Sequence, residues 1–132
     1  MIQESAPWRR CLGKDAELID RWSLKRAVTE RRSFLIEQTI FLAAYTMRKL
    51  ADAKKLSSSF DGRSIPCKVI PGASKHTDLL HKHPITDYYD FARIRSASIG
   101  ARSLLNLIVH SYAFVEALRD DFTIGGVHSW RP

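Results

Sequence analysis

Residues 23–56 contain neither glycine nor proline, the two residue types that most often interrupt regular structure. Their apolar side chains recur at the spacing of one helical face, which predicts a long α-helix over the whole stretch. Ser23 is the expected N-cap, and the pair Lys54–Lys55 suits the C-terminal end of a helix. The pair Arg31–Arg32 interrupts the apolar face, so two helical segments are the alternative. The positions expected to be buried are Leu24, Ala27, Val28, Leu35, Leu42, Leu50 and Ala53.

A second long helix is expected over residues 96–120, where apolar side chains cover most of the helical circumference. Such a helix normally lies at the centre of a bundle. Between the two helices, residues 57–96 contain three prolines, which exclude long regular elements and predict an irregular loop. A short helix over residues 14–20 is expected to precede the first long one.

The C-terminal residues 122–130 have a different pattern, in which two short runs flank Gly125–Gly126. This arrangement predicts a short β-hairpin with a Gly-Gly turn. We therefore expect a mainly α fold, a small antiparallel helical bundle with a long irregular middle loop and a short C-terminal β-hairpin. Residues 1–132 are expected to form one domain around a single core.

Composition and charge limit the class of protein. Hydrophobic residues make up 45% of the chain and charged residues 27%, as in soluble globular proteins. No apolar run reaches the roughly 20 residues that span a bilayer, and the N-terminus lacks a secretory signal pattern, so we expect a cytoplasmic protein without membrane contact. Cys11 and Cys67 fit no metal or redox motif and are expected to be reduced thiols.

The net charge of +7 favours a polyanionic partner such as RNA, although positive charge also serves solubility alone. Paired basic residues recur along the first half of the chain, and Trp8 and Trp22 are available to stack on bases. These pairs form either a basic track or an ordinary solvated helix face. The pairs are Arg9–Arg10, Arg31–Arg32, Arg48–Lys49 and Lys54–Lys55.

The middle segment carries a group of histidines and aspartates. They could gather around a transition metal, because imidazole and carboxylate are suitable ligands. Their spacing matches no metal motif, so a polar loop with scattered histidines is the favoured interpretation. The residues are His76, His81, His83, Asp78 and Asp87.

Three polar side chains recur at every fourth position of the otherwise apolar second helix: Arg102, Asn106 and His110. Four residues drift only about 40° around a helix axis, so the three side chains form one polar stripe. Burial of a cation, an amide and an imidazole without partners is unfavourable. We therefore expect the stripe to face a cleft or a second subunit.

Residues 106–112, Asn-Leu-Ile-Val-His-Ser-Tyr, resemble the signature of HEPN domains. In that family of small helical bundles the motif is an arginine, four to six residues and a histidine. A polar residue, often asparagine, commonly follows the arginine, and an aromatic residue often stands two places after the histidine. Asn106, His110 and Tyr112 match these three positions. The arginine departs from the pattern, because Arg102 leaves seven residues before His110.

The resemblance implies a metal-independent endoribonuclease of a bacterial toxin or phage-defence system, with RNA as its substrate and no cofactor or metal. It further implies a homodimer packed through residues 96–120, with one composite cleft, and an antitoxin as a protein partner. His110 would take the proton of the ribose 2′-hydroxyl and Arg102 would clamp the phosphate. Asn106 would either orient the phosphate or fix the tautomer of the imidazole. Tyr112, Arg48 and Lys49 are the residues expected to bind RNA.

Two non-catalytic alternatives stay open. In the first, the chain is a helical interaction module or a subunit of a larger complex. The stripe is then a polar seam, in which Asn106 and His110 bond to the middle segment and Arg102 reaches solvent or a carboxylate such as Asp87 or Asp90. In the second, the chain is a basic module that binds nucleic acid without cleaving it, with an affinity that falls steeply with salt.

Overall fold

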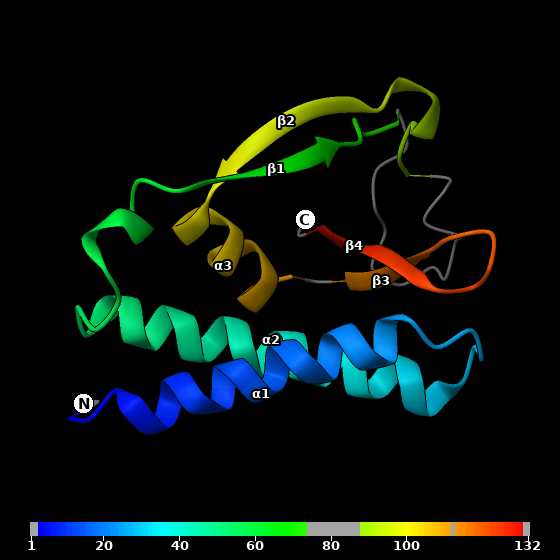
Figure 1. The fold of residues 1–132 in the computed structure, drawn as a ribbon. Coiled ribbons are helices and arrows are strands. Elements are labelled where there is room, and N and C mark those ends of the chain that lie inside the picture. The colour runs from blue at the N-terminus through cyan, green and yellow to red at the C-terminus, as the bar shows by residue number, and fades with distance from the viewer. Residues whose placement is uncertain (1–2, 74–87, 112, 131–132) are drawn as a thin grey trace.

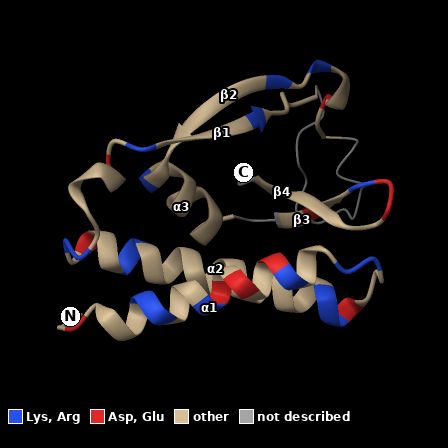
Figure 2. Ribbon diagram, in the orientation of Figure 1, with Lys and Arg blue, Asp and Glu red and all other residues tan. Residues whose placement is uncertain are grey.

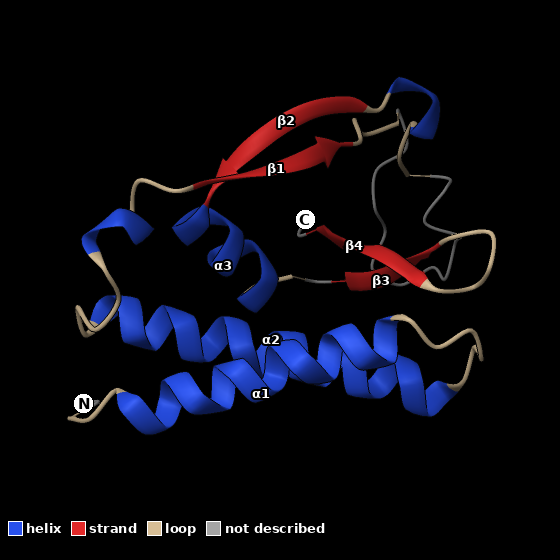
Figure 3. Ribbon diagram, viewed as in Figure 1, coloured by secondary structure: helices blue, strands red, loops and turns tan. Residues whose placement is uncertain are grey.

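In a computed structural model, which describes residues 3–73, 88–111 and 113–130, the chain forms three α-helices and two antiparallel sheets of two strands each (Figure 3). The fold is therefore mixed α/β, and the expected mainly α bundle is wrong. The histidines of the middle segment, His76, His81 and His83, lie outside the described residues.

The N-terminal half is an antiparallel pair of helices, α1 (Ala6–Ser23) and α2 (Glu30–Asp52), which lie side by side (Figure 1). The single helix predicted over residues 23–56 is wrong in its first part. Ser23 ends α1 instead of capping the next helix. The actual cap of α2 is Thr29, whose hydroxyl accepts a 3.1 Å hydrogen bond from the backbone N–H of Arg32.

The loop between α1 and α2 leaves two apolar side chains in solvent. Leu24 is 67% exposed and Val28 is 58% exposed, although both were expected in the core. Because these two residues supplied the apolar positions of the first predicted turns, their loss from the core explains why the helix begins later than the pattern suggested. Leu50, at the other end of α2, is fully buried as predicted.

The expected irregular middle contains a β-hairpin, which corrects the prediction of a long irregular loop with at most a short extended segment at residues 67–70. Strand β1 (Ser64–Val69) pairs antiparallel with β2 (Arg95–Gly100), and Ile65 stands opposite Ile99. Exposed and half-buried residues alternate along β1, as expected for a strand with one covered face. Short 3₁₀ helices, η1 (Ser58–Phe60) and η3 (Phe91–Arg93), precede the two strands.

The second predicted helix is also shorter than expected. Helix α3 (Ala101–Val109) ends where a helix over residues 96–120 was predicted to continue, and β3 (Ala113–Leu118) replaces its second half. The ring centroids of Phe114 in β3 and Phe41 in α2 lie 5.2 Å apart, so β3 packs against α2. This long-range contact favours a strand where local spacing favoured a helix.

Strand β4 (Ile124–Trp130) pairs antiparallel with β3 and forms the C-terminal hairpin that was predicted. The position of its turn was predicted wrongly, because Gly125–Gly126 lies within β4. The turn is formed by the residues between the strands. In it the N–H of Arg119 donates to the carbonyl oxygen of Thr123 over 2.8 Å, and Phe122 has a positive φ of 67°.

Three layers follow from these elements. The α1–α2 pair forms one side, α3 and the β3–β4 hairpin lie over α2, and the β1–β2 hairpin lies beyond α3 (Figure 1). Side chains from α2, α3 and β4 form the core: Ile36, Ala44, Leu50, Ala51, Ala101, Leu105 and Ile124. Within the described ranges, no helix is both long and apolar enough to cross a lipid bilayer.

Candidate functional site

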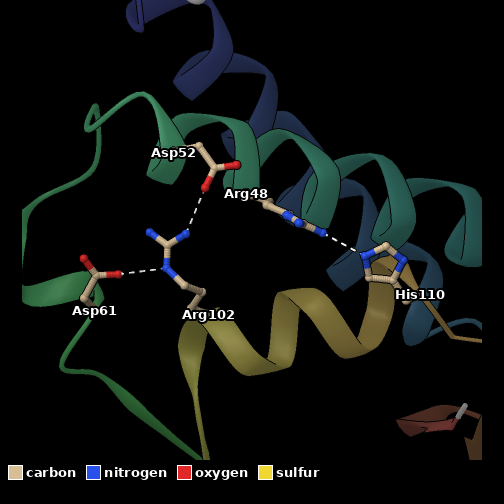
Figure 4. A network of polar contacts seen from close by, with 5 residues as sticks. All are labelled: Arg48, Asp52, Asp61, Arg102 and His110. Atoms are coloured by element: carbon tan, nitrogen blue, oxygen red, sulfur yellow. Dashed lines mark hydrogen bonds and ion pairs between the residues drawn. The ribbon is translucent and has the colours of Figure 1, made fainter.

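Arg102, in the first turn of α3, is bound to two carboxylates of the same chain (Figure 4). Its Nη1 donates to Oδ1 of Asp52 over 2.9 Å, and its Nε donates to Oδ1 of Asp61 over 3.2 Å. The hydrogen bonds to Asp52 and then Asp61 raise the pKa of Arg102 above its usual value. The guanidinium is thereby compensated by two negative charges, which leaves it poorly suited to attract a phosphate.

Asp52 and Asp61 take the place of the carboxylates considered from the sequence. Asp87 lies outside the described residues, and Oδ1 of Asp90 accepts a hydrogen bond from the N–H of Ala92. Asp52 ends α2 and Asp61 follows η1, at sequence separations of 50 and 41 from Arg102. No local spacing in the sequence could have indicated either partner.

His110 follows the last turn of α3 and meets Arg48 of α2 (Figure 4). Nη1 of Arg48 and Nε2 of His110 lie 2.9 Å apart, and the His110 side chain is on the surface. A guanidinium has only donors, so Nε2 must accept this hydrogen bond. The contact therefore requires a neutral imidazole with its proton on Nδ1.

Asn106 lies between these two contacts along α3 and is half-buried. Its Oδ1 is buried and has no hydrogen-bond partner within the part of the chain that the structure describes. Arg102 and His110 both reach from α3 toward α2 and its C-terminal loop (Figure 4). Two of the three residues of the predicted stripe, Arg102 and His110, thus have partners within the same chain.

Two of the predicted RNA-binding residues, Arg48 and Lys49, contact different partners. Arg48 joins His110, whereas Nζ of Lys49 lies 5.4 Å from the ring centroid of Tyr45. Tyr112 lies outside the described residues. Of the predicted basic track, Arg32 is fully buried. Lys and Arg are intermixed with Asp and Glu along α1 and α2 (Figure 2).

The described ranges contain no metal-binding cluster and no disulfide. No group of three or more His, Cys, Asp or Glu side chains gathers there as a set of ligands. Cys11 is exposed and Cys67 is half-buried, and both are free thiols.

The outer face of α2 exposes three large apolar side chains that the sequence did not single out as a site. Phe34 and Leu42 are each 58% exposed, and Tyr45 is 51% exposed. At about 100° per residue the three fall within an arc of about 80°. We call them the α2 face. Leu42 was expected in the core, so the pattern of apolar spacing mistook this outward face for an inward one.

Charge differs between the two ends of the α2 face. By the same angular spacing, Glu37 and Arg48 lie about 20° apart and on one flank of the face. Glu37 is near the N-terminal end of the face and is exposed, and Arg48 is near its C-terminal end and is half-buried. The flank is thus acidic at one end and basic at the other.

Comparison of the chain with models of protein families, with curated proteins and with solved structures found no match. The fold and the contacts described here therefore carry the functional argument. They define a small α/β protein with a polar seam between two helices and an exposed apolar helix face.

Proposed function

We propose that the chain is a non-catalytic interaction module that pairs with a second copy of itself through the α2 face. The observation that carries this proposal is the exposure of Phe34, Leu42 and Tyr45 on one side of α2. Scattered single apolar residues on a surface are ordinary, but several on one helix face are typical of an interaction site. The second copy buries them and removes their contact with water.

The polar stripe acts in this proposal as a seam inside one protomer. Arg102 joins α3 to the end of α2 and to the following loop through Asp52 and Asp61. His110 joins the other end of α3 to α2 about one turn before the end of α2, through Arg48. With α3 held at both ends, the seam supports α2 beside its exposed face, because Arg48 also lies on the flank of that face.

Charge selects the direction of pairing. Two α2 helices related by a two-fold axis near Leu42 run antiparallel, and matching flanks then lie opposite each other. Glu37 of one protomer faces Arg48 of the other, since the two positions are about equally far from Leu42. A guanidinium has five N–H donors, so Arg48 can bind this carboxylate while it still donates to His110.

Sedimentation equilibrium tests this function with Leu42→Glu and the matched control Leu24→Glu. Leu24 is also an exposed leucine, at 67%, but it lies in the loop before α2. We expect the wild type and L24E to be dimers and L42E to be a monomer that retains the wild-type circular dichroism. A wild type that is monomeric at all concentrations, or an L42E variant that still dimerises, would overturn the proposal.

RNA cleavage of the HEPN type is the second candidate, and the exposed contact between Arg48 and His110 is the observation that favours it. A cation beside an imidazole is a pairing that phosphate-ester cleavage can use. In this candidate Arg48, and not Arg102, stabilises the phosphate, and Nε2 of His110 must leave Arg48 before it can act as a base. Loss of RNA degradation in His110→Ala, with Arg102→Ala retaining it, is the expected result. Equal RNA stability with wild type, H110A and no protein would remove this candidate.

A further inference from the structure

The β1–β2 sheet has only two strands, so each strand has one edge that pairs with the other strand and one edge that faces away from it. Strand β2 runs along the outer margin of the molecule, and its first four residues are exposed (Figure 1). The strand shares no residue with the α2 face, so an inference from it stands apart from the proposed self-association.

The register of the sheet decides which backbone groups of β2 point away from β1. In an antiparallel pair, directly opposite residues alternate between those that exchange hydrogen bonds and those that do not. The N–H of Ala101 donates to the carbonyl oxygen of Arg63 over 2.9 Å, which fixes the alternation at that end of the ladder. Counted from there, Pro66 and Ser98 are a pair without mutual hydrogen bonds, which suits a residue that has no N–H. The N–H and C=O groups of Ser98, and of Ser96 two residues away, therefore point to the free edge.

The two free edges of the sheet differ in how well they accept another strand. On β1, by the same alternation, the outward backbone groups belong to Ser64, Pro66 and Lys68. Pro66 offers no donor and Lys68 carries an exposed charge, and both features protect an edge strand from further pairing. On β2, Ser96 and Ser98 have small, uncharged, exposed side chains, and their outward backbone groups have no partner in the described ranges. The edge of β2 is thus the open one.

Charge on and beside the two strands is of one sign. Residues 62–70 and 91–100 include four Lys or Arg and no Asp or Glu. All four are exposed, and none of them forms an ion pair within the described part of the chain: Arg63, Lys68, Arg93 and Arg95. Figure 2 shows this pattern along β1 and β2. A segment that carries carboxylates is favoured here, because opposite charges across an interface speed the encounter and exclude wrong partners.

We propose that β2 binds an extended, acidic peptide segment as a third strand of the β1–β2 sheet. The backbone of the segment pairs with the N–H and C=O groups of Ser96 and Ser98, and its carboxylates lie near Arg93 and Arg95. A polyanion such as RNA could use the four charges, but it has no amide backbone with the spacing of a strand.

Amide hydrogen exchange, measured by NMR on the wild-type chain, tests the pairing. The probe is a blocked heptapeptide in which glutamate and valine alternate, and its matched control has lysine in place of glutamate. We expect the glutamate peptide to slow the exchange of the Ser96 and Ser98 N–H groups by at least about fivefold and to leave those of Ser64 and Lys68 unchanged. The lysine peptide should bind at least about tenfold more weakly.

Two pairs of variants separate backbone pairing from charge. Ser96→Pro removes one outward N–H from β2, and its control Ser64→Pro removes one from β1; Pro66 shows that such a position accepts proline. S96P should weaken binding of the glutamate peptide by at least about fivefold, and S64P should leave it unchanged. Arg95→Glu should weaken binding by about tenfold, whereas Arg10→Glu, which changes an exposed charge on α1, should have little effect.

Three results would overturn the proposal. The first is no binding of the glutamate peptide to the wild type, or slowed exchange at Ser64 and Lys68 instead. The second is a loss of binding in R95E but not in a folded S96P, since binding would then depend on charge alone. The third is slow exchange of the Ser96 and Ser98 N–H groups in the protein alone that increases with its concentration, since a second copy would then cover the edge. The exchange measurement needs no substitution, so it decides the question even where S96P does not fold.

Discussion

Arg32 is fully buried at the start of α2, and its Nη1 donates a 2.7 Å hydrogen bond to the carbonyl oxygen of Phe122 in the turn between β3 and β4. The same nitrogen donates to the carbonyl oxygen of Lys25 over 2.7 Å. One side chain thus joins the α1–α2 loop, α2 and the C-terminal hairpin. Its Nε and Nη2 are buried without partners in the described ranges, so the position is occupied by a strongly desolvated cation.

Replacement of Arg32 by alanine is expected to destabilise the fold by about 2–4 kcal/mol, because it leaves a cavity and removes the donor from the carbonyl groups of Lys25 and Phe122. Urea denaturation followed by circular dichroism measures the effect. Arg31→Ala is the matched control, since Arg31 is exposed and should change the free energy of unfolding by no more than about 0.5 kcal/mol. Equal effects of the two substitutions would contradict this role of Arg32.

Asp121 stabilises the same turn in a pH-dependent way. Its Oδ1 accepts hydrogen bonds from the hydroxyl of Thr123 over 2.6 Å and from the backbone N–H of Thr123 over 3.0 Å. These bonds, the hydroxyl first, hold the pKa of Asp121 below its ordinary value of 3.8. The ionised carboxylate therefore stabilises the fold above the unfolded-state pKa, and this contribution is lost as the pH falls through the lower, folded-state pKa.

Asp121→Asn is accordingly expected to lower the midpoint of thermal unfolding at neutral pH. The difference from wild type should shrink as the pH falls from 3.8 through the lower, folded-state pKa, below which both proteins carry a neutral side chain. Asp120→Asn, at the exposed neighbouring position, is the control. A difference that stays constant with pH, or one of equal size in D120N, would show that the charge of Asp121 does not matter.

The contacts of Arg102 predict a salt-dependent stabilisation. The side chains of Arg102, Asp52 and Asp61 are 44%, 49% and 67% exposed, so the ion pairs are open to screening. A double-mutant cycle of Arg102→Ala and Asp52→Ala should give a favourable coupling at low salt that decreases at high salt. A coupling of zero at low salt would exclude the seam as a stabilising feature.

The Arg48–His110 contact predicts the tautomer of the imidazole. Nitrogen-15 NMR at a pH where His110 is neutral should show its proton on Nδ1, because Nε2 accepts from Arg48. In Arg48→Met, which keeps the length of the chain but has no donor, the tautomer should shift toward a mixture. A proton on Nε2 in the wild type would contradict the contact.

The sequence anticipated those features that depend on near neighbours. Most of α2 follows from its glycine-free apolar periodicity. A C-terminal hairpin was predicted from Gly125–Gly126, but these residues lie within β4 and the turn precedes that strand. The pairing of Ile65 with Ile99 and the packing of Phe114 on Phe41 join distant segments. Such contacts leave no periodic signal, so β1 and β2 were missed and β3 was taken for a helix.

The candidate site was predicted only in part, because helix spacing is a local signal and the partners of the site residues are distant in sequence. Of the predicted stripe, Arg102 and Asn106 lie in α3, whereas His110 follows its last residue, Val109. Their partners come from elsewhere in the chain, and only the folded structure shows that Asp52 and Asp61 compensate Arg102. The sequence also did not indicate that the α2 face points outward, because the apolar spacing of a helix is the same whether that face packs on the core or on a second subunit.

Disulfide trapping between two single-cysteine variants tests the antiparallel pairing of α2 most directly. Glu37→Cys and Arg48→Cys are each made in a chain whose Cys11 and Cys67 are replaced by serine, and the two proteins are oxidised separately and as a mixture. Position 37 of one protomer lies opposite position 48 of the other in the proposed dimer, so a covalent dimer should form in the mixture and not with either variant alone. No covalent dimer in the mixture, or equal amounts from each variant alone, would contradict the proposed function.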